Sequence, residues 1–240
     1  LKVGAYGLLR VMYNVFDISF LVEVGWNKIV LIIAGVTMIL GSIYAIMQTD
    51  IKRRLAYSSV AQMGYILLGL ALVSQQALIG NMFHIFAHAT MKSCLFLSAG
   101  AIILQTGKRN ISEFAGLGRR MPWTFAAFTM AALSMIGIPP FTGFLSKWYL
   151  GLGALETGQP IYVVLLLISS LLNAAYYLPI VISAFFGKVS DELKDVPECS
   201  LRMLVPIILL ALCTIVFDLA PTNLPLEIST ITANFLLGGR

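Results

Sequence analysis

Two histidines and a lysine, spaced four residues apart, are the side chains of this sequence best suited to chemistry. His84, His88 and Lys92 lie in the apolar stretch Gly80–Leu104, and they include both histidines of the chain. Residues four apart lie on one side of an α-helix, so the three side chains form a polar stripe about 12 Å long. Ionisable groups at bilayer depth are costly and usually face a bundle interior or a water-filled path. The stripe therefore predicts a proton relay; the alternative is that the histidines only hold neighbouring helices together.

A second chemically suited residue, Lys147, follows an interruption in the later apolar segment Pro122–Leu150. The segment is apolar up to Gly137, and Pro139 and Pro140 then prevent the helical hydrogen-bond ladder from continuing. A span that is broken by glycine and proline and also carries a charge indicates a discontinuous helix at a transport site. The alternative is a proline kink with Lys147 extending to the membrane surface.

These residue types suit proton transfer without a metal or an organic cofactor. Desolvation disfavours the charged form of a lysine in hydrocarbon, and a nearby carboxylate or an added proton restores it. Lys92 and Lys147 could therefore change charge near neutral pH, with His84 and His88 passing protons between them. The sequence has no metal-ligand or disulfide spacing, nucleotide-binding loop, flavin fingerprint or nucleophile triad. Any redox step would have to take place in another subunit.

The composition places these residues in a polytopic membrane protein. Hydrophobic residues make up 59% of the 240 and charged residues 11%, and the mean hydropathy is +0.90. A soluble domain of this size does not need so much apolar surface. The net charge of +5 sits in short loops, which indicates control of topology rather than nucleic-acid binding.

The apolar segments predict an all-α bundle of about seven transmembrane helices, one of them discontinuous. In chain order they are Leu1–Phe16, Asn27–Met47, Leu55–Val73, Gly80–Leu104, Pro122–Leu150, Pro160–Phe186 and Met203–Leu219. We expect residues 1–219 to form the transmembrane domain and residues 220–240 an interfacial or extramembrane tail. Because the chain begins at Leu1 inside an apolar run, we expect it to be the back part of a longer protein.

Among the loops between the predicted helices, only alternate ones carry basic residues. With the broken segment counted as one crossing, the loops 48–54, 105–121 and 187–202 fall on one side, and the opposite loops contain no Lys or Arg. The basic residues are Lys52, Arg53, Arg54, Lys108, Arg109, Arg119, Arg120, Lys188, Lys194 and Arg202. The positive-inside rule predicts that these loops are cytoplasmic, in a chain that we expect in a prokaryotic cell membrane.

Three ordered motifs resemble the antiporter-like subunits of Mrp-type sodium/proton antiporters, respiratory complex I (NADH-quinone oxidoreductase) and energy-converting hydrogenases. They are DIKRRLAYSSVAQMGYILLGLAL (50–72), FHIFAHATMKSCLFLSAGAI (83–102) and IGIPPFTGFLSKWYL (136–150). The opening LKVGAYGLLR also resembles the eighth helix of this family. The resemblance implies a fourteen-helix protein with two inverted five-helix repeats, of which this chain supplies helices eight to fourteen and so the second repeat.

The same resemblance implies roles for individual residues. Lys2 corresponds to the lysine of the eighth helix, and His84, His88 and Lys92 correspond to the polar stripe of the eleventh. Lys147 corresponds to the ionisable residue of the second broken helix, on the proton exit side. One complex I subunit has a glutamate there, whereas the Mrp D subunit, the hydrogenase counterpart and two other complex I subunits have lysine. The family's first repeat, with its glutamate–lysine pair, is absent from this chain.

The function that the resemblance implies is proton translocation within a multi-subunit complex. The stretch NAAYYLP (173–179) is similar to the pattern of the Mrp D subunit and favours that branch, with complex I and hydrogenase subunits as alternatives. An alternative of another class is a non-conducting half-antiporter that docks neighbouring subunits. The expected partners are other hydrophobic subunits, the lipid bilayer, protons and, in the Mrp branch, Na⁺; no nucleic acid and no cofactor are expected.

Overall fold

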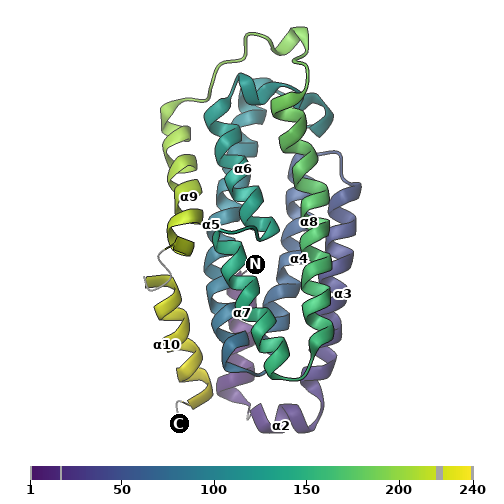
Figure 1. The fold of residues 1–240 in the computed structure, drawn as a ribbon, viewed down its shortest axis with the longest axis vertical. Helices are drawn as coiled ribbons and strands as arrows, with labels where there is room; N and C mark the ends of the chain where they lie inside the picture. Colours follow the sequence, from purple (N-terminus) through teal and green to yellow (C-terminus); the bar gives the residue numbers. More distant parts are fainter. Residues whose placement is uncertain (1, 17, 220–223, 239–240) are drawn as a thin grey trace.

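The structure is a computed structural model that describes residues 2–16, 18–219 and 224–238, and it consists of helices joined by short loops (Figure 1). The helices are α1 (Lys2–Arg10), α2 (Ile18–Glu23), α3 (Trp26–Met47), α4 (Ile51–Ala71), α5 (Gln75–Thr106), α6 (Pro122–Ile136), α7 (Thr142–Glu156), α8 (Pro160–Phe186), α9 (Leu201–Leu219) and α10 (Leu224–Gly238). A π-helical turn, Val11–Val15, follows α1. Of the described residues, four helices, α3, α5, α8 and α9, are long and apolar enough to span a membrane. The predicted all-α membrane class is confirmed.

Helix α5 runs through the bundle and packs against most of its neighbours. It contacts α4, α6, α7, α9 and α10, while α3 packs against α4 and α8. Helices α6 and α7 follow one another along the height of the bundle, and α9 and α10 stand on the opposite side of the molecule from α3 (Figure 1). The polar stripe of α5 is therefore enclosed by other helices.

Side-chain caps explain why α4 and α5 begin earlier than the sequence predicts. The Asp50 carboxylate accepts a hydrogen bond from Arg53 N at 3.0 Å, so α4 begins at Ile51 instead of Leu55. Ser74 Oγ accepts from Ala77 N at 3.1 Å, so α5 begins at Gln75 instead of Gly80. The charged and amide residues after each cap belong to the first helical turn, although their polarity is typical of loops.

The broken segment separates into α6 and α7 at mid-height of the bundle (Figure 1). Gly137 has φ +89°, and its N–H donates to Leu133 O and Ser134 O, each at 3.0 Å, which closes the end of α6. Pro139 and Pro140 lie in the turn that follows, and α7 begins at Thr142. Helix α7 extends to Glu156, beyond the predicted end at Leu150.

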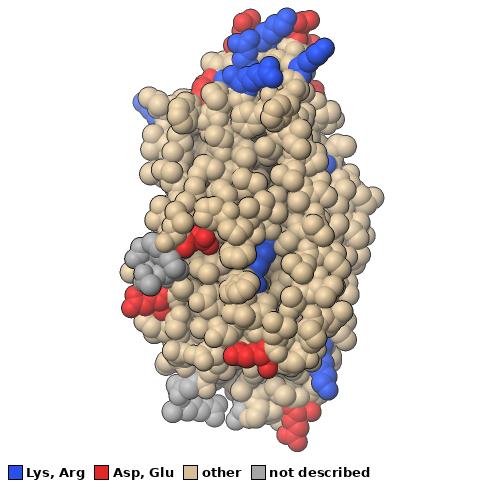
Figure 2. Space-filling model, in the orientation of Figure 1, with Lys and Arg blue, Asp and Glu red and all other residues tan. Residues whose placement is uncertain are grey.

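The three basic loops meet at one end of the bundle. Ile51 N donates to Arg109 O at 3.1 Å, and the Lys108 ammonium lies 3.2 Å from the Glu192 carboxylate. Hydrogen bonding to Glu192 raises the pKa of the partly exposed Lys108 side chain. Figure 2 shows Lys and Arg gathered with acidic side chains at this end, above a largely uncharged belt. That this end is cytoplasmic stays a prediction.

The expected tail contains helix α10, which stands beside α5 (Figure 1). Gln75 Nε2 donates to Asn234 Oδ1 at 2.7 Å and so connects α10 to the start of α5. Residues 220–223, where the tail was expected to begin, lie outside the described residues. The domain boundary after residue 219 stays a prediction.

Candidate functional site

The amine of Lys92 lies at one end of the polar stripe, in a cage of neutral oxygen atoms. It donates to Leu55 O at 3.0 Å, to Tyr177 Oη at 3.2 Å and to Ser58 Oγ. The amine also lies 5.9 Å from the centre of the Tyr177 ring, within range of a cation–π contact. Lys92 is only 6% exposed, so α4 and α8 together enclose it.

The two histidine rings continue the stripe towards the middle of the bundle. The ring centroids of Tyr65 and His84 lie 5.4 Å apart, those of His84 and His88 lie 5.8 Å apart, and both pairs are stacked. His84 Nδ1 lies 3.0 Å from Ser146 Oγ on α7. Helix α7 therefore contacts the stripe directly.

The middle of the stripe contains buried polar atoms that lack a protein partner among the described residues. They are His84 Nε2, both ring nitrogens of His88 and both amide atoms of Gln62. The antiparallel register set by the Lys92–Ser58 and His84–Tyr65 contacts places Gln62 opposite His88. Buried polar groups are normally satisfied by protein or water, so this is the part of the stripe that water can bridge.

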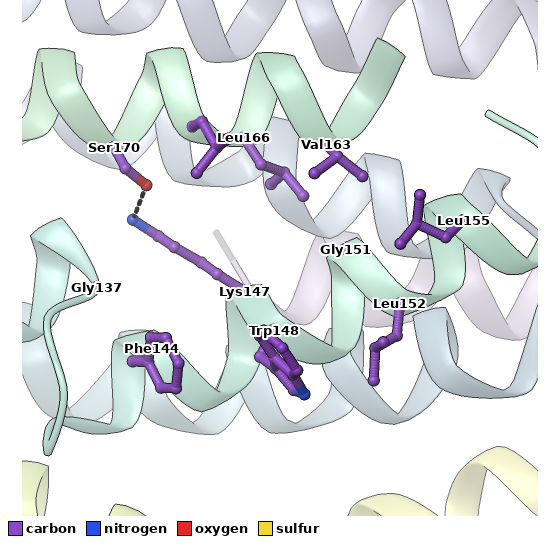
Figure 3. Close-up of a pocket in the computed structure, with 11 residues that line it drawn as sticks. Gly137, Phe144, Lys147, Trp148, Gly151, Leu152, Leu155, Val163, Leu166 and Ser170 are labelled. Atoms are coloured by element: carbon purple, nitrogen blue, oxygen red, sulfur yellow. Dashed lines mark hydrogen bonds between the residues drawn. The ribbon is translucent and has the colours of Figure 1, made fainter. Parts of the chain in front are cut away.

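The amine of Lys147 is directed into the protein, at the break between α6 and α7. It donates to Met135 O at 2.9 Å and to Ile136 O at 2.7 Å. It also donates to Ser170 Oγ on α8 at 2.9 Å, the bond drawn in Figure 3. The two carbonyls are at the C-terminal end of α6, where unpaired carbonyls and the helix dipole favour a cation. A Cβ at Gly137 would lie 2.9 Å from Lys147 Cδ, so glycine is required there both by its positive φ and by the path of the lysine.

A cavity of about 280 Å³ opens beside Lys147, between α7 and α8. Figure 3 shows the lysine reaching across the opening to Ser170. The other residues that line the cavity carry no polar side chain except the Trp148 indole: Gly137, Phe144, Trp148, Gly151, Leu152, Leu155, Val163, Leu166 and Leu167. Leu155 and Val163 lie towards the end of the bundle opposite the basic loops, so the cavity extends from Lys147 in that direction.

Polar side chains of α8 connect the surroundings of the two lysines. Asn173 Nδ2 donates to Met135 O at 3.1 Å, the same carbonyl that accepts from Lys147. Tyr176 Oη donates to Asn173 Oδ1 at 2.5 Å, and the Tyr176 and Tyr177 ring centroids lie 4.6 Å apart. Tyr177 in turn contacts Lys92, so a second polar series runs parallel to the histidines.

The structure brings four predicted residues, His84, His88, Lys92 and Lys147, into one line of polar groups. Lys2 is half-buried on α1, which packs against α4. Among the residues the structure describes, no group of three or more His, Cys, Asp or Glu side chains could hold a metal ion. The roles of all five residues stay predictions.

The sequence prediction did not include the hydroxyl partners of these residues. They are Ser58, Ser146, Ser170 and Tyr177. For three of them the sequence holds a weak signal, a helical spacing that places polar residues on one helix face. Ser58 shares this spacing with Gln62 and Tyr65, and Ser170 and Tyr177 share it with Asn173.

The fold and the site together define an antiporter-like subunit of the membrane, with a broken helix and a buried lysine–histidine line. Residues 1–195 match the family described as "NADH:quinone oxidoreductase/Mrp antiporter, TM", and the chain belongs to this family. It is therefore an integral multi-pass membrane protein, and the predicted resemblance is confirmed.

Proteins similar to this chain come from more than one kind of complex. The chain is 42% identical to the N subunit of the NADH-quinone oxidoreductase of Desulforudis audaxviator, over 91% of this chain and 46% of the relative. It is 34% identical to the D subunit of the Na(+)/H(+) antiporter of Alkalihalophilus pseudofirmus, over 91% and 44%. A chain in the structure of the Mrp complex from Dietzia sp. DQ12-45-1b superposes with a TM-score of 0.91 at 26% identity, covering 99% of this chain and 52% of that one. The chain spans about half the length of these relatives.

Proposed function

We propose that this chain is a proton-translocating subunit of a multi-subunit membrane complex, and that protons pass along Lys147, His84, His88 and Lys92. The observation that carries the proposal is the bonding of Lys147. An ammonium has three N–H donors, and two carbonyls and the Ser170 hydroxyl accept them. A neutral amine has two donors and a lone pair, to which the same hydroxyl can donate. One set of partners therefore suits both forms of the lysine.

The proposed path runs from the cavity at Lys147 to the end of the bundle where the basic loops meet. Ser146 lies next to Lys147 in the chain and bonds His84, whose ring stacks with His88. Lys92 bonds the Leu55 carbonyl in the second turn of α4, nearer the basic loops. By the positive-inside rule, Lys92 then faces the cytoplasm and Lys147 the opposite side.

Two kinds of complex are candidates for the assembly. The 42% identity to a NADH-quinone oxidoreductase subunit favours a complex in which partner subunits carry out redox chemistry. The stretch 173–179 and the 34% identity to a Na(+)/H(+) antiporter subunit favour exchange of protons for sodium, the function that the sequence favours. Inverted membrane vesicles with a pH-sensitive dye distinguish them. Acidification on adding an electron donor and a quinone supports the first, and a pH change on adding NaCl without a donor supports the second.

The relay is tested by Lys147→Ala, with Lys28→Ala as the matched control because Lys28 is exposed on α3. We expect Lys147→Ala to abolish proton transport in vesicles while the assembled complex keeps its mobility on a native gel. Lys28→Ala should keep the wild-type rate. Transport at the wild-type rate in Lys147→Ala contradicts the relay.

The docking alternative makes a different prediction. An interhelical hydrogen bond in a membrane contributes about 0.6 kcal/mol, so alanine at His84 or Lys92 would then weaken assembly before it affected transport. Loss of the complex on the native gel, with normal transport by the complex that remains, would support docking.

A further inference from the structure

We propose that Ser146 is a positioning residue that fixes the tautomer of His84, so that Nε2 is the nitrogen that takes up a proton. The inference rests on the proposed function and deepens it. It concerns one contact between the half-helix after the break, α7, and the histidine helix, α5.

The hydrogen bonds of Ser146 determine which nitrogen of His84 carries the proton. Ser146 Oγ lies 3.0 Å from His84 Nδ1 and 3.0 Å from Gly143 O, and both side chains are fully buried. Ser146 Oγ donates to Gly143 O, since a carbonyl oxygen can only accept, and this bond uses the one proton of the hydroxyl. The hydroxyl oxygen is then left to accept from His84, and this requires N–H at Nδ1.

The other side of the imidazole ring favours the same tautomer. His84 Nε2 is buried and has no hydrogen-bond partner among the described residues. A proton at Nε2 would have no protein acceptor among the described residues, whereas a proton at Nδ1 leaves at Nε2 only a lone pair. Unpaired buried N–H groups are rarer in proteins than under-satisfied acceptors. Neutral His84 therefore presents a basic Nε2 to a proton carrier.

The close packing of α7 on α5 holds Ser146 in place. A Cβ at Gly80 would lie 2.8 Å from Leu150 N and 3.1 Å from Ser146 O, so glycine allows the two backbones to approach. The next residue after Ser146 is Lys147, and neighbouring residues on a helix point about 100° apart. One half-helix thus places its lysine against α8 and its serine against His84.

The test is the tautomer of His84, read by ¹⁵N NMR of histidine-labelled full-length protein in lipid. The His84 signals are those that disappear in His84→Gln. We expect the neutral wild-type ring to carry its proton on Nδ1. Ser146→Ala should move the tautomer ratio about fivefold towards the Nε2–H form, the effect of one neutral hydrogen bond, and should slow proton transport.

Two further variants separate positioning from packing. Ser98→Ala makes the same change at another fully buried serine of the bundle, on α5, and should leave the His84 ratio unchanged. Ser146→Thr keeps the hydroxyl and should restore the wild-type ratio. An Nε2–H ring in the wild type, or an unchanged ratio in Ser146→Ala, overturns the inference.

The NMR measurement and the transport measurement fail independently. If Lys147→Ala transports protons normally, the relay is wrong, but the tautomer of His84 is still measured in the wild type, with His84→Gln used only to assign its signals. If Ser146→Ala slows transport while the ratio stays the same, the positioning role is wrong and the relay stands.

Discussion

The contact between α7 and the end of α6 leaves no room for a side chain at Gly143, and we therefore predict that Gly143→Ala lowers the stability of the protein. A Cβ at this position would lie 1.6 Å from Ser134 O and 2.7 Å from Ser134 C. These are backbone atoms and cannot turn aside, so Gly143→Ala must push α7 away from α6. Overpacking of this kind costs about 1–3 kcal/mol. This cost exceeds the gain in stability of about 0.4–1 kcal/mol that replacing a helical glycine by alanine otherwise brings.

Gly151 provides the matched control on the same helix. A Cβ there meets no atom within 4 Å, so Gly151→Ala should stabilise the protein by about 0.4–1 kcal/mol. Thermal unfolding in detergent, followed by intrinsic fluorescence, should therefore show a lower Tm for Gly143→Ala and a higher Tm for Gly151→Ala. Displacing α7 also moves Lys147 away from Met135 O, so Gly143→Ala should slow proton transport. Shifts of the same sign in both variants would refute the packing described for the break.

Two further predictions concern the loop before α9. Glu198 accepts a hydrogen bond from Trp123 N at 2.9 Å at the start of α6, so Glu198→Ala should cost about 1–2 kcal/mol of unfolding free energy in a denaturation experiment. Glu192→Ala, which removes an exposed ion pair, should change it little, and equal losses would contradict the capping role. Burial raises the pKa of the Cys199 thiol and leaves only 5% of the residue exposed, so at pH 7.5 less reactive thiolate is present and a reagent reaches it less readily. A maleimide should therefore label Cys199 more slowly than the added cysteine of Ser200→Cys, with the difference narrowing as the pH rises; equal rates at pH 7.5 would contradict this.

The parts of the site that could be predicted from the sequence are those encoded by local spacing. The four-residue interval of His84, His88 and Lys92 defines a helix face without knowledge of the fold. Gly137 and the two prolines after it interrupt a helix because of their own backbone chemistry. Helix α8 has the predicted bounds, 160–186, because proline at its first position and glycine after its last are local signals.

The partners of these residues could not be predicted because they depend on how helices are rotated against each other. Ser146 and Ser170 are single hydroxyls in apolar helices, and serine is common in membrane helices for packing alone. Only the packed bundle shows that Ser146 faces His84 and that Ser170 faces Lys147. The early starts of α4 and α5 were missed for another reason, since polar residues in a first helical turn resemble a loop.

The hydrogen bonding of Lys147 also depends on the position of another helix. Of its three partners, two are carbonyls of α6, and the third, Ser170, belongs to α8 and is the one that can also donate. If α8 moves outward by about the length of one hydrogen bond, the two carbonyls still accept N–H donors, but the ammonium loses its third acceptor and the neutral amine loses the donor to its lone pair. A displacement of α8 would therefore change the hydrogen bonding of both forms of Lys147 without any contact to the lysine itself. Under the proposed function, the broken helix would hold the proton, and the unbroken helix beside it would set how well each form of the lysine is hydrogen-bonded.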